Sequence, residues 1–180
     1  MKIIECRKIE NQTVFDCCEH IMPDGNPEEW RGITVFGDLL PYPERKPAPG
    51  VFLLLDHVRK TADRTGDKAQ LLLIGEGLTE TARDYFAYVD RVFVYDAPGF
   101  DEFDPVRLEK ILWHFIDNFK PAEVLFLPDE EKKVPFMKTV EKVCVYLNCE
   151  ESLQAVKIET VPPVPDAAHR GELVICEIPE

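Results

Sequence analysis

The sequence contains no long hydrophobic run and has few basic residues for its acidic content. No apolar segment approaches the ~20 residues that a membrane-spanning helix needs. Residues 1–15 lack an apolar core followed by a cleavage site, so we expect no secretory signal and a cytoplasmic protein. The formal net charge is −13, from 21 Lys and Arg against 34 Asp and Glu. Nucleic acids and anionic membranes bind clustered basic residues, so neither is an expected partner.

Several motifs of catalysis and ligand binding are also absent. The sequence has no GxxxxGK[ST] phosphate loop, no GxSxG nucleophile elbow and no Ser-Gly-Gly-x-Asp-Ser pyrophosphate loop. Its six cysteines form no CxxC pair and have no histidine at zinc-finger distance, so free thiols are expected, with Cys17 and Cys18 the suspected pair if any cysteine reacts. His114 is expected on the solvated face of a helix. We therefore predict no catalytic residue and no metal site.

The clearest feature that is present is a strand–helix–strand unit in the second half of the chain. Two branched or aromatic runs, Val92–Tyr95 and Val124–Leu127, have the length of buried strands. Between them, Asp104 is a good N-cap, Pro105 suits a first helical turn, and Lys120-Pro121 ends the helix. This order predicts a right-handed parallel crossover, the seed of an α/β sheet.

The remaining elements extend this unit in both directions. We expect a hairpin from residues 2–6 and 13–17, strands at 33–36 and 70–74, helices at 49–65 and 79–88 and a last helix with Pro135 in its first turn, then strands at 153–161 and 172–178. Gly66 is the expected C-cap of the first helix. The predicted fold is α/β with a doubly wound, mostly parallel sheet, an N-terminal hairpin extension and a C-terminal antiparallel strand pair. One domain is expected over 1–180, with an extension (1–31), a core (32–149) and C-terminal strands or an arm (150–180).

Candidate binding residues follow from the rule that ligands bind outside the carboxyl ends of parallel strands, where strand order reverses. The candidates are six residues in the loops expected at these ends: Gly37, Asp38, Gly75, Gly77, Asp96 and Asp129. Gly75-Glu76-Gly77 begins like a dinucleotide fingerprint, but position 80 is Glu rather than Gly. Ordinary turns and a solvated acidic surface are the alternative explanation of these loops.

Three stretches carry a resemblance to a known family: Ile74-Gly75-Glu76-Gly77, residues 89–105 (VDRVFVYDAPGFDEFDP) and residues 118–128 (NFKPAEVLFLP). Through them, residues 33–149 resemble the N-terminal domain of the electron transfer flavoprotein alpha subunit. The resemblance implies a three-layer, adenine nucleotide alpha hydrolase-like fold. That family holds its flavin mainly in a second, C-terminal domain, so the resemblance assigns FAD to no residue here. No cofactor is predicted in the isolated chain, and FAD or AMP follows from the resemblance alone.

Three functions remain open. The first is an electron transfer flavoprotein alpha-like domain that lacks the FAD-binding domain and associates with itself, as a homodimer, or with a beta-subunit-like redox partner. The second is an adenine-nucleotide or small-molecule binding module, which would use the loops at residues 37–38 and 128–129. The third is an acid-lined, metal-dependent hydrolase. The strand-like runs Val156–Val161 and Leu173–Ile178 would leave exposed strand edges, so we expect the tail to support an interface unless it folds back as an edge hairpin.

Overall fold

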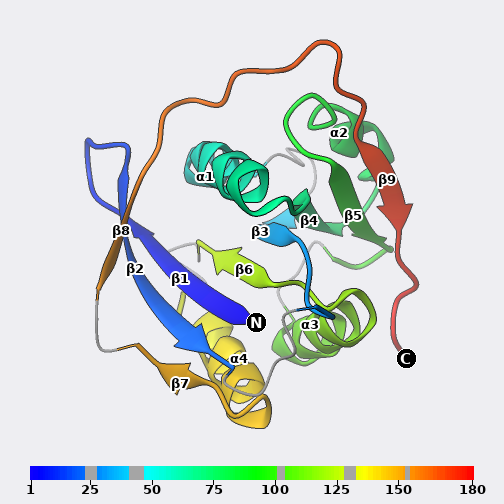
Figure 1. Cartoon of the computed structure of the whole chain (residues 1–180). Coiled ribbons are helices and arrows are strands. Elements are labelled where there is room, and N and C mark those ends of the chain that lie inside the picture. Colours follow the sequence, from blue (N-terminus) through cyan, green and yellow to red (C-terminus); the bar gives the residue numbers. More distant parts are fainter. Residues whose placement is uncertain (23–27, 41–46, 101–103, 128–132, 153–154) are drawn as a thin grey trace.

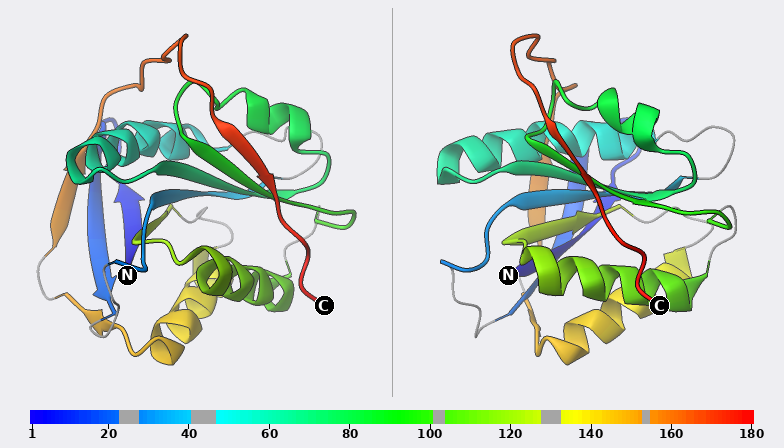
Figure 2. Two further views of the ribbon diagram at one scale, coloured as in Figure 1. Left: turned by 45° about the vertical axis from the view of Figure 1, so that its right-hand side comes forward. Right: turned by 90° about the vertical axis from the view of Figure 1, so that its right-hand side faces the viewer.

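A single sheet runs through the molecule and is covered by helices on both faces (Figure 1). The computed structural model describes the chain apart from residues 23–27, 41–46, 101–103, 128–132 and 153–154. Helices α1 (Pro49–Thr65) and α2 (Thr79–Arg83) lie on one face, and α3 (Pro105–Phe119) and α4 (Lys133–Tyr146) on the other (Figure 2). The predicted α/β fold with three layers and a mostly parallel sheet is confirmed.

Nine strands form this sheet in the described part of the chain. They are β1 (Lys2–Lys8), β2 (Val14–Ile21), β3 (Ile33–Leu40), β4 (Ala69–Gly75), β5 (Arg91–Asp96), β6 (Glu123–Phe126), β7 (Glu150–Glu151), β8 (Val156–Glu159) and β9 (Glu172–Ile175). Their order is β7-β2-β1-β6-β3-β4-β5-β9, with β8 also paired to β2. The six strands from β1 to β9 in this order are mutually parallel. The chain therefore lays down β3, β4 and β5 in one direction and then returns to place β6 on the other side of β3.

The helix ends follow the local sequence signals. The Asp104 carboxylate accepts hydrogen bonds from the N–H groups of Val106 and Arg107, and Pro105 is the first residue of α3. Gly66 ends α1 in the left-handed region, with φ 72°, and its N–H donates to the Ala62 carbonyl. Both predicted ends are therefore confirmed by the interactions that physically terminate a helix.

Two hydrophobic cores are separated by the sheet. In β4, Leu71 and Leu73 face the α1 side, whereas Leu72 and Ile74 face the α3 side, and all four are fully buried. Such burial on both faces is typical of a parallel strand covered by helices on each side. The α1 core includes Leu54, Leu55, Val58, Ala62, Val92 and Val94, and the α3 core includes Leu108, Ile111, Leu112, Phe115, Phe93 and Phe126.

The N-terminal hairpin is formed as predicted and belongs to the main sheet. β1 and β2 pair antiparallel, with Lys2 opposite Ile21 and Lys8 opposite Phe15. On its other side β1 pairs in parallel with β6, which buries Ile3 and Ile4 on opposite faces of the sheet.

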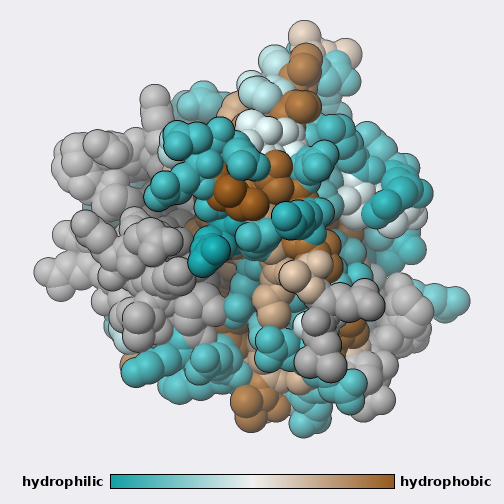
Figure 3. All heavy atoms as spheres, turned by 90° about the vertical axis from the view of Figure 1, so that its left-hand side faces the viewer, coloured by the Kyte–Doolittle hydropathy of each residue, from teal (hydrophilic) through white to brown (hydrophobic). Residues whose placement is uncertain are grey.

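The surface on the β8 side of the molecule is largely hydrophilic where it is described, with small hydrophobic patches (Figure 3).

The two C-terminal strands differ from the predicted antiparallel pair. β8 joins β2 in antiparallel pairing, whereas β9 joins β5 in parallel pairing at the opposite edge of the sheet. The chain between them passes over the α1 side of the molecule (Figures 1 and 2). In this position, β9 places Leu173 against the α1 core and Val174 against the α3 core. Because each strand completes a different edge, the two do not pair with each other.

Candidate functional site

The carboxyl end of β3 lies at the point where the strand order reverses. β6 returns beside β3, with Phe36 opposite Phe126, while β4 lies on the other side of β3. In open α/β sheets, ligands bind in the crevice outside such a reversal. The end of β3, which carries Gly37 and Asp38, therefore stands at the position where the fold favours a ligand.

Gly37 and Asp38 lie inside β3, not in a loop after Phe36 as predicted. β3 continues to Leu40, with a register shift against β4 between Phe36 and Leu39. A Cβ atom at position 37 would lie 2.6 Å from the Leu73 Cδ2 atom and 3.1 Å from the Leu72 carbonyl oxygen. The close approach of β4 thus explains why residue 37 is glycine. Asp129, the candidate after β6, lies outside the described residues.

Gly75, Gly77 and Asp96 are brought together at the ends of β4 and β5. Gly75 and Asp96 are opposite each other in the parallel register, and the Gly75 carbonyl accepts from the Ala97 N–H. The Asp96 carboxylate accepts hydrogen bonds from the N–H groups of Gly77, at 2.6 Å, and Leu78, at 2.9 Å. Gly77 has φ 68°, in the left-handed region that favours glycine. These residues therefore hold the turn between β4 and α2, and ligand binding by them remains a prediction.

The acidic residues at this edge do not gather into a metal site in the part of the chain that the structure describes. No group of three or more His, Cys, Asp or Glu residues there is arranged to hold a metal ion. Glu76 instead accepts a hydrogen bond from the Gly99 N–H, at 3.3 Å. The described carboxylates of these turns are thus engaged with backbone amides.

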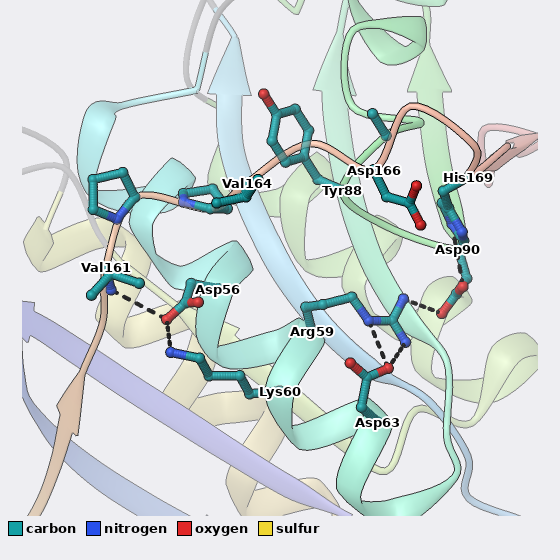
Figure 4. A pocket seen from close by; sticks show the side chains of 13 residues that line it. Asp56, Arg59, Lys60, Asp63, Tyr88, Asp90, Val161, Val164, Asp166 and His169 are labelled. Carbon is teal, nitrogen blue, oxygen red and sulfur yellow. Dashed lines mark hydrogen bonds and ion pairs between the residues drawn. The ribbon is translucent and has the colours of Figure 1, made fainter.

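A pocket of about 520 Å³ lies elsewhere, on the α1 face and near the amino end of β5 (Figure 4). Its walls come from three parts of the chain: the middle of α1, the segment just before β5, and residues 161–169, which we call the crossover segment. The lining residues include Asp56, Arg59, Lys60, Asp63, Tyr88, Asp90, Val164, Asp166 and His169. The sequence contains no signal for this pocket because its walls meet only when β9 pairs with β5.

The charges in the pocket are paired with one another. The Arg59 guanidinium donates to Asp90 at 2.9 Å and to Asp63 at 2.6 Å, and the Lys60 ammonium donates to Asp56 at 2.8 Å (Figure 4). A phosphate or carboxylate ligand would have to compete with these carboxylates for each cation. The pocket therefore presents no uncompensated basic group for an anion among its described residues.

Two largely buried carboxylates of the pocket hold the crossover segment. Asp56 accepts from the Val161 N–H at 3.2 Å, and the His169 Nε2 atom lies 3.3 Å from Asp90 and 2.9 Å from the Val89 carbonyl oxygen. Between these anchors, Pro162, Pro163 and Pro165 have no N–H to donate. The structure thus fixes both ends of the segment on the α1 face, and between them the Asp166 N–H donates to the Ala87 carbonyl at 2.9 Å.

All six cysteines are free thiols, as expected, but their surroundings differ. Cys17 is buried with its Sγ atom 3.3 Å from Cys6 Sγ, across the β1–β2 pair. Burial, together with a hydrogen bond to Glu151, raises the pKa of Cys18 to about 11, which disfavours the nucleophilic thiolate. A hydrogen bond with Cys144 lowers the pKa of the Cys149 thiol, although burial acts in the opposite direction. The lowered pKa favours the thiolate of Cys149, and which cysteine reacts first remains a prediction.

His114 is not the solvated surface residue that its helix position predicts. Its Nδ1 atom lies 2.7 Å from the hydroxyl oxygen of Tyr95, which is fully buried in β5. Burial raises the pKa of Tyr95 above its usual value, so the phenol stays neutral. The pair ties α3 to the sheet, because each side chain supplies the hydrogen-bond partner that the other needs.

Comparison with known proteins gives two distant relatives. The chain is 36% identical over 97 residues to a protein described as lactate dehydrogenase (NAD(+),ferredoxin) subunit LctC, from Acetobacterium woodii, and this stretch is 53% of the chain and 22% of the relative. It is 30% identical over 94 residues to the electron transfer flavoprotein subunit alpha of Megasphaera elsdenii, which is 52% of the chain and 27% of the relative. Over about half of its length, the chain is related to electron transfer flavoprotein alpha subunits, and this relationship supports the resemblance seen in the sequence.

The similarity extends over part of each protein. No protein-family model matches the chain. The matched stretches span about a quarter of the length of the two relatives.

Among the described residues, no helix is both long enough and apolar enough to cross a membrane.

Proposed function

We propose that this protein is an electron transfer flavoprotein alpha-like component that works by association with a redox partner which carries the flavin. The observation that carries the proposal is the identity of 36% over 97 residues with a subunit of a ferredoxin- and NAD-linked lactate dehydrogenase. The similarity to an electron transfer flavoprotein alpha subunit points in the same direction. Both relatives are named as subunits, which suits a protein that functions within an assembly.

The placement of the flavin on the partner has its own support. The dinucleotide part of FAD needs donors for its pyrophosphate, commonly the free N–H groups of a helix N-terminus or a glycine-rich turn. In the turn after β4, the Gly77 and Leu78 N–H groups already donate to Asp96. In the pocket, Arg59 and Lys60 are paired with carboxylates. We therefore expect the isolated chain to bind no flavin.

The test is purification of the tagged chain from the cells that make it, with identification of the proteins that accompany it. The proposal expects a flavoprotein or another redox subunit in stoichiometric amount, with flavin absorbance in the complex and none in the chain alone. Recovery of the chain without any redox protein, or with stoichiometric flavin in the isolated chain, contradicts the proposal.

A second candidate is an adenine-nucleotide binding module at the reversal of strand order. The adjacency of β3 and β6 favours it, because nucleotides in such folds bind in the crevice beyond the carboxyl ends of the strands at a reversal of strand order, and Asp38 belongs to the carboxyl end of β3. Calorimetric titration with AMP tests it. The candidate expects saturable binding of AMP that is weakened in Asp38→Asn and retained in Asp63→Asn, since Asp63 lies on α1 and is exposed. Absence of binding, or equal binding by both variants, removes this candidate.

A further inference from the structure

The two edges of the sheet are finished in different ways. At the β2 edge, the outermost strands are β7, which is two glutamates, and β8, whose four residues alternate Val156, Lys157, Ile158 and Glu159. Short strands and charged side chains are the usual protection of a sheet edge against pairing with another chain. At the other edge, β9 has three consecutive apolar residues, Leu173 to Ile175. β9 is as short as β8, but Glu172 is its only charged residue, so charged side chains protect this edge less than the first.

The backbone of β9 is arranged to accept a further strand. The N–H groups of Glu172 and Cys176 donate toward β5, to the carbonyls of Asp90 and Val94, each at 2.9 Å. In a parallel ladder, alternate residues point to opposite sides, so Leu173 and Ile175 direct their N–H and C=O groups outward. No other strand of the described chain pairs with this side of β9. β9 is the outermost strand on the right-hand side of the sheet in Figure 1.

The side chains of this edge leave apolar surface in solvent. Ile175 is 67% exposed, although Leu173, on the same face of the strand, packs against the α1 core. Val174 and Cys176 pack on the opposite face. A strand placed beside β9 would cover Ile175 and satisfy the outward backbone groups at the same time.

We propose that β9 pairs antiparallel with β9 of a second copy, about a two-fold axis at Val174, to give one continuous sheet across a homodimer. In this register, Leu173 faces Ile175 of the second copy as a hydrogen-bonded pair, and the two-fold repeats the pair. Glu172 then faces Cys176 of the second copy, and Glu177 faces Gly171. No acidic residue of the strand stands opposite another, and Glu172 keeps its ion pair with Arg91, at 3.0 Å.

The symmetric register is what favours a second copy as the occupant. It matches apolar to apolar residues at the centre of the strand and separates the glutamates at its ends, as stable cross-strand pairs require. Each copy carries a net charge of −13, so long-range repulsion opposes the dimer and salt should strengthen it, because the Debye length falls to about 8 Å at 0.15 M. The inference concerns the strand edge and does not depend on the proposed redox function.

Sedimentation equilibrium of the purified chain tests the proposal. Wild-type protein should sediment with twice the chain mass of 20.7 kDa, and its dimer should become tighter as salt is raised. Ile175→Lys, which puts a charge on the edge, should be monomeric, and Ile175→Pro, which removes the outward N–H and the exposed side chain without adding a charge, should also lose the dimer. Val164→Lys is the matched control, because Val164 is 85% exposed but lies away from β9, and it should remain dimeric.

Circular dichroism and urea unfolding of each variant establish that the fold persists. A wild-type chain that stays monomeric up to about 0.1 mM, a concentration that would populate even a weak dimer, overturns the proposal. So does a dimer that survives both Ile175 substitutions with the fold intact. A dimer lost equally in Val164→Lys would also overturn it, because the interface would then lie on the crossover segment.

Discussion

Asp90 and Asp63 provide a direct test of how the crossover segment and α1 are held to the sheet. Both carboxylates bind the Arg59 guanidinium, but the Asp90 side chain is 14% exposed and the Asp63 side chain is 64% exposed. Asp90 also accepts from the Ala69 N–H at 2.7 Å, at the start of β4, and lies 3.3 Å from His169. Replacing each by alanine therefore removes the same kind of ion pair from a buried site and from a surface site.

The expected cost for Asp90→Ala is about 3 kcal/mol of unfolding free energy. Ala69 is fully buried, so its N–H would be left without an acceptor at a cost of roughly 1–3 kcal/mol. Arg59 would lose an ion pair worth about 1 kcal/mol, because its side chain is 32% exposed and solvent weakens the interaction. Asp63→Ala should cost no more than about 0.5 kcal/mol, the usual range for an exposed i,i+4 pair.

Urea unfolding followed by circular dichroism measures both values, with the slope of the transition as a check on two-state behaviour. Equal losses in the two variants would show that the surface pair, and not the buried acceptor, holds Arg59 in place. A loss below about 1 kcal/mol for Asp90→Ala would mean that Ala69 and His169 find other partners, and Asp90 would then not be the group that fastens these segments.

Three other predictions concern Leu112, Cys149 and His57. Leu112→Ala, in the α3 core, should lower the free energy of unfolding in urea by about 2–5 kcal/mol, whereas Val106→Ala, at a position 62% exposed, should lower it by less than about 0.5 kcal/mol. Similar losses in the two variants would show that the buried face of α3 is assigned wrongly. Cys149 should be the cysteine alkylated fastest by iodoacetamide near neutral pH, since its pKa is lowered and that of Cys18 is raised, and peptide mass spectrometry after a short pulse would contradict this if Cys18 were labelled first. Burial lowers the pKa of His57 from 6.5, so the unfolded chain binds the proton more tightly and the stability of the fold should decrease as the pH drops below about 6.5. A His57→Gln variant should show a shallower decrease. A pH profile of stability that is unchanged in this variant would contradict the role of His57.

Local signals in the sequence predicted the elements whose ends depend on neighbouring residues. The α3 start at Asp104-Pro105 and the α1 end at Gly66 are determined by hydrogen bonds within a single turn. The hairpin of β1 and β2 forms around a short turn, where Asn11 has φ 57°. Such elements need no information from distant parts of the chain.

Elements that depend on distant partners were predicted less well. The helix expected over 79–88 ends at Arg83, and the Phe86 and Ala87 carbonyls instead accept from the N–H groups of Gly171 and Asp166. The same long-range pairing places β9 beside β5 in parallel, which no local pattern between residues 160 and 172 indicates. His114 likewise has a local pattern typical of a surface residue, but its partner Tyr95 comes from β5.

The candidate site shows the same division. Gly75, Gly77 and Asp96 were predicted as a group, and the structure brings them together because parallel strands end at one edge. The pocket beside Arg59 could not be predicted, because its walls come from segments about 30 and 100 residues apart in sequence. The ligand expected at the end of β3 remains a prediction.

Sedimentation velocity recorded in the absorption band of flavin is the most direct test of the proposed association. Only molecules that carry flavin are visible in that band, and the isolated chain is expected to be invisible. The experiment adds the purified chain to the flavoprotein that accompanies it in cells. If the chain is an alpha-like partner, the flavin boundary moves faster after the addition and saturates at a fixed ratio of the two proteins. An unchanged flavin boundary at saturating concentrations of the chain would contradict the proposed function.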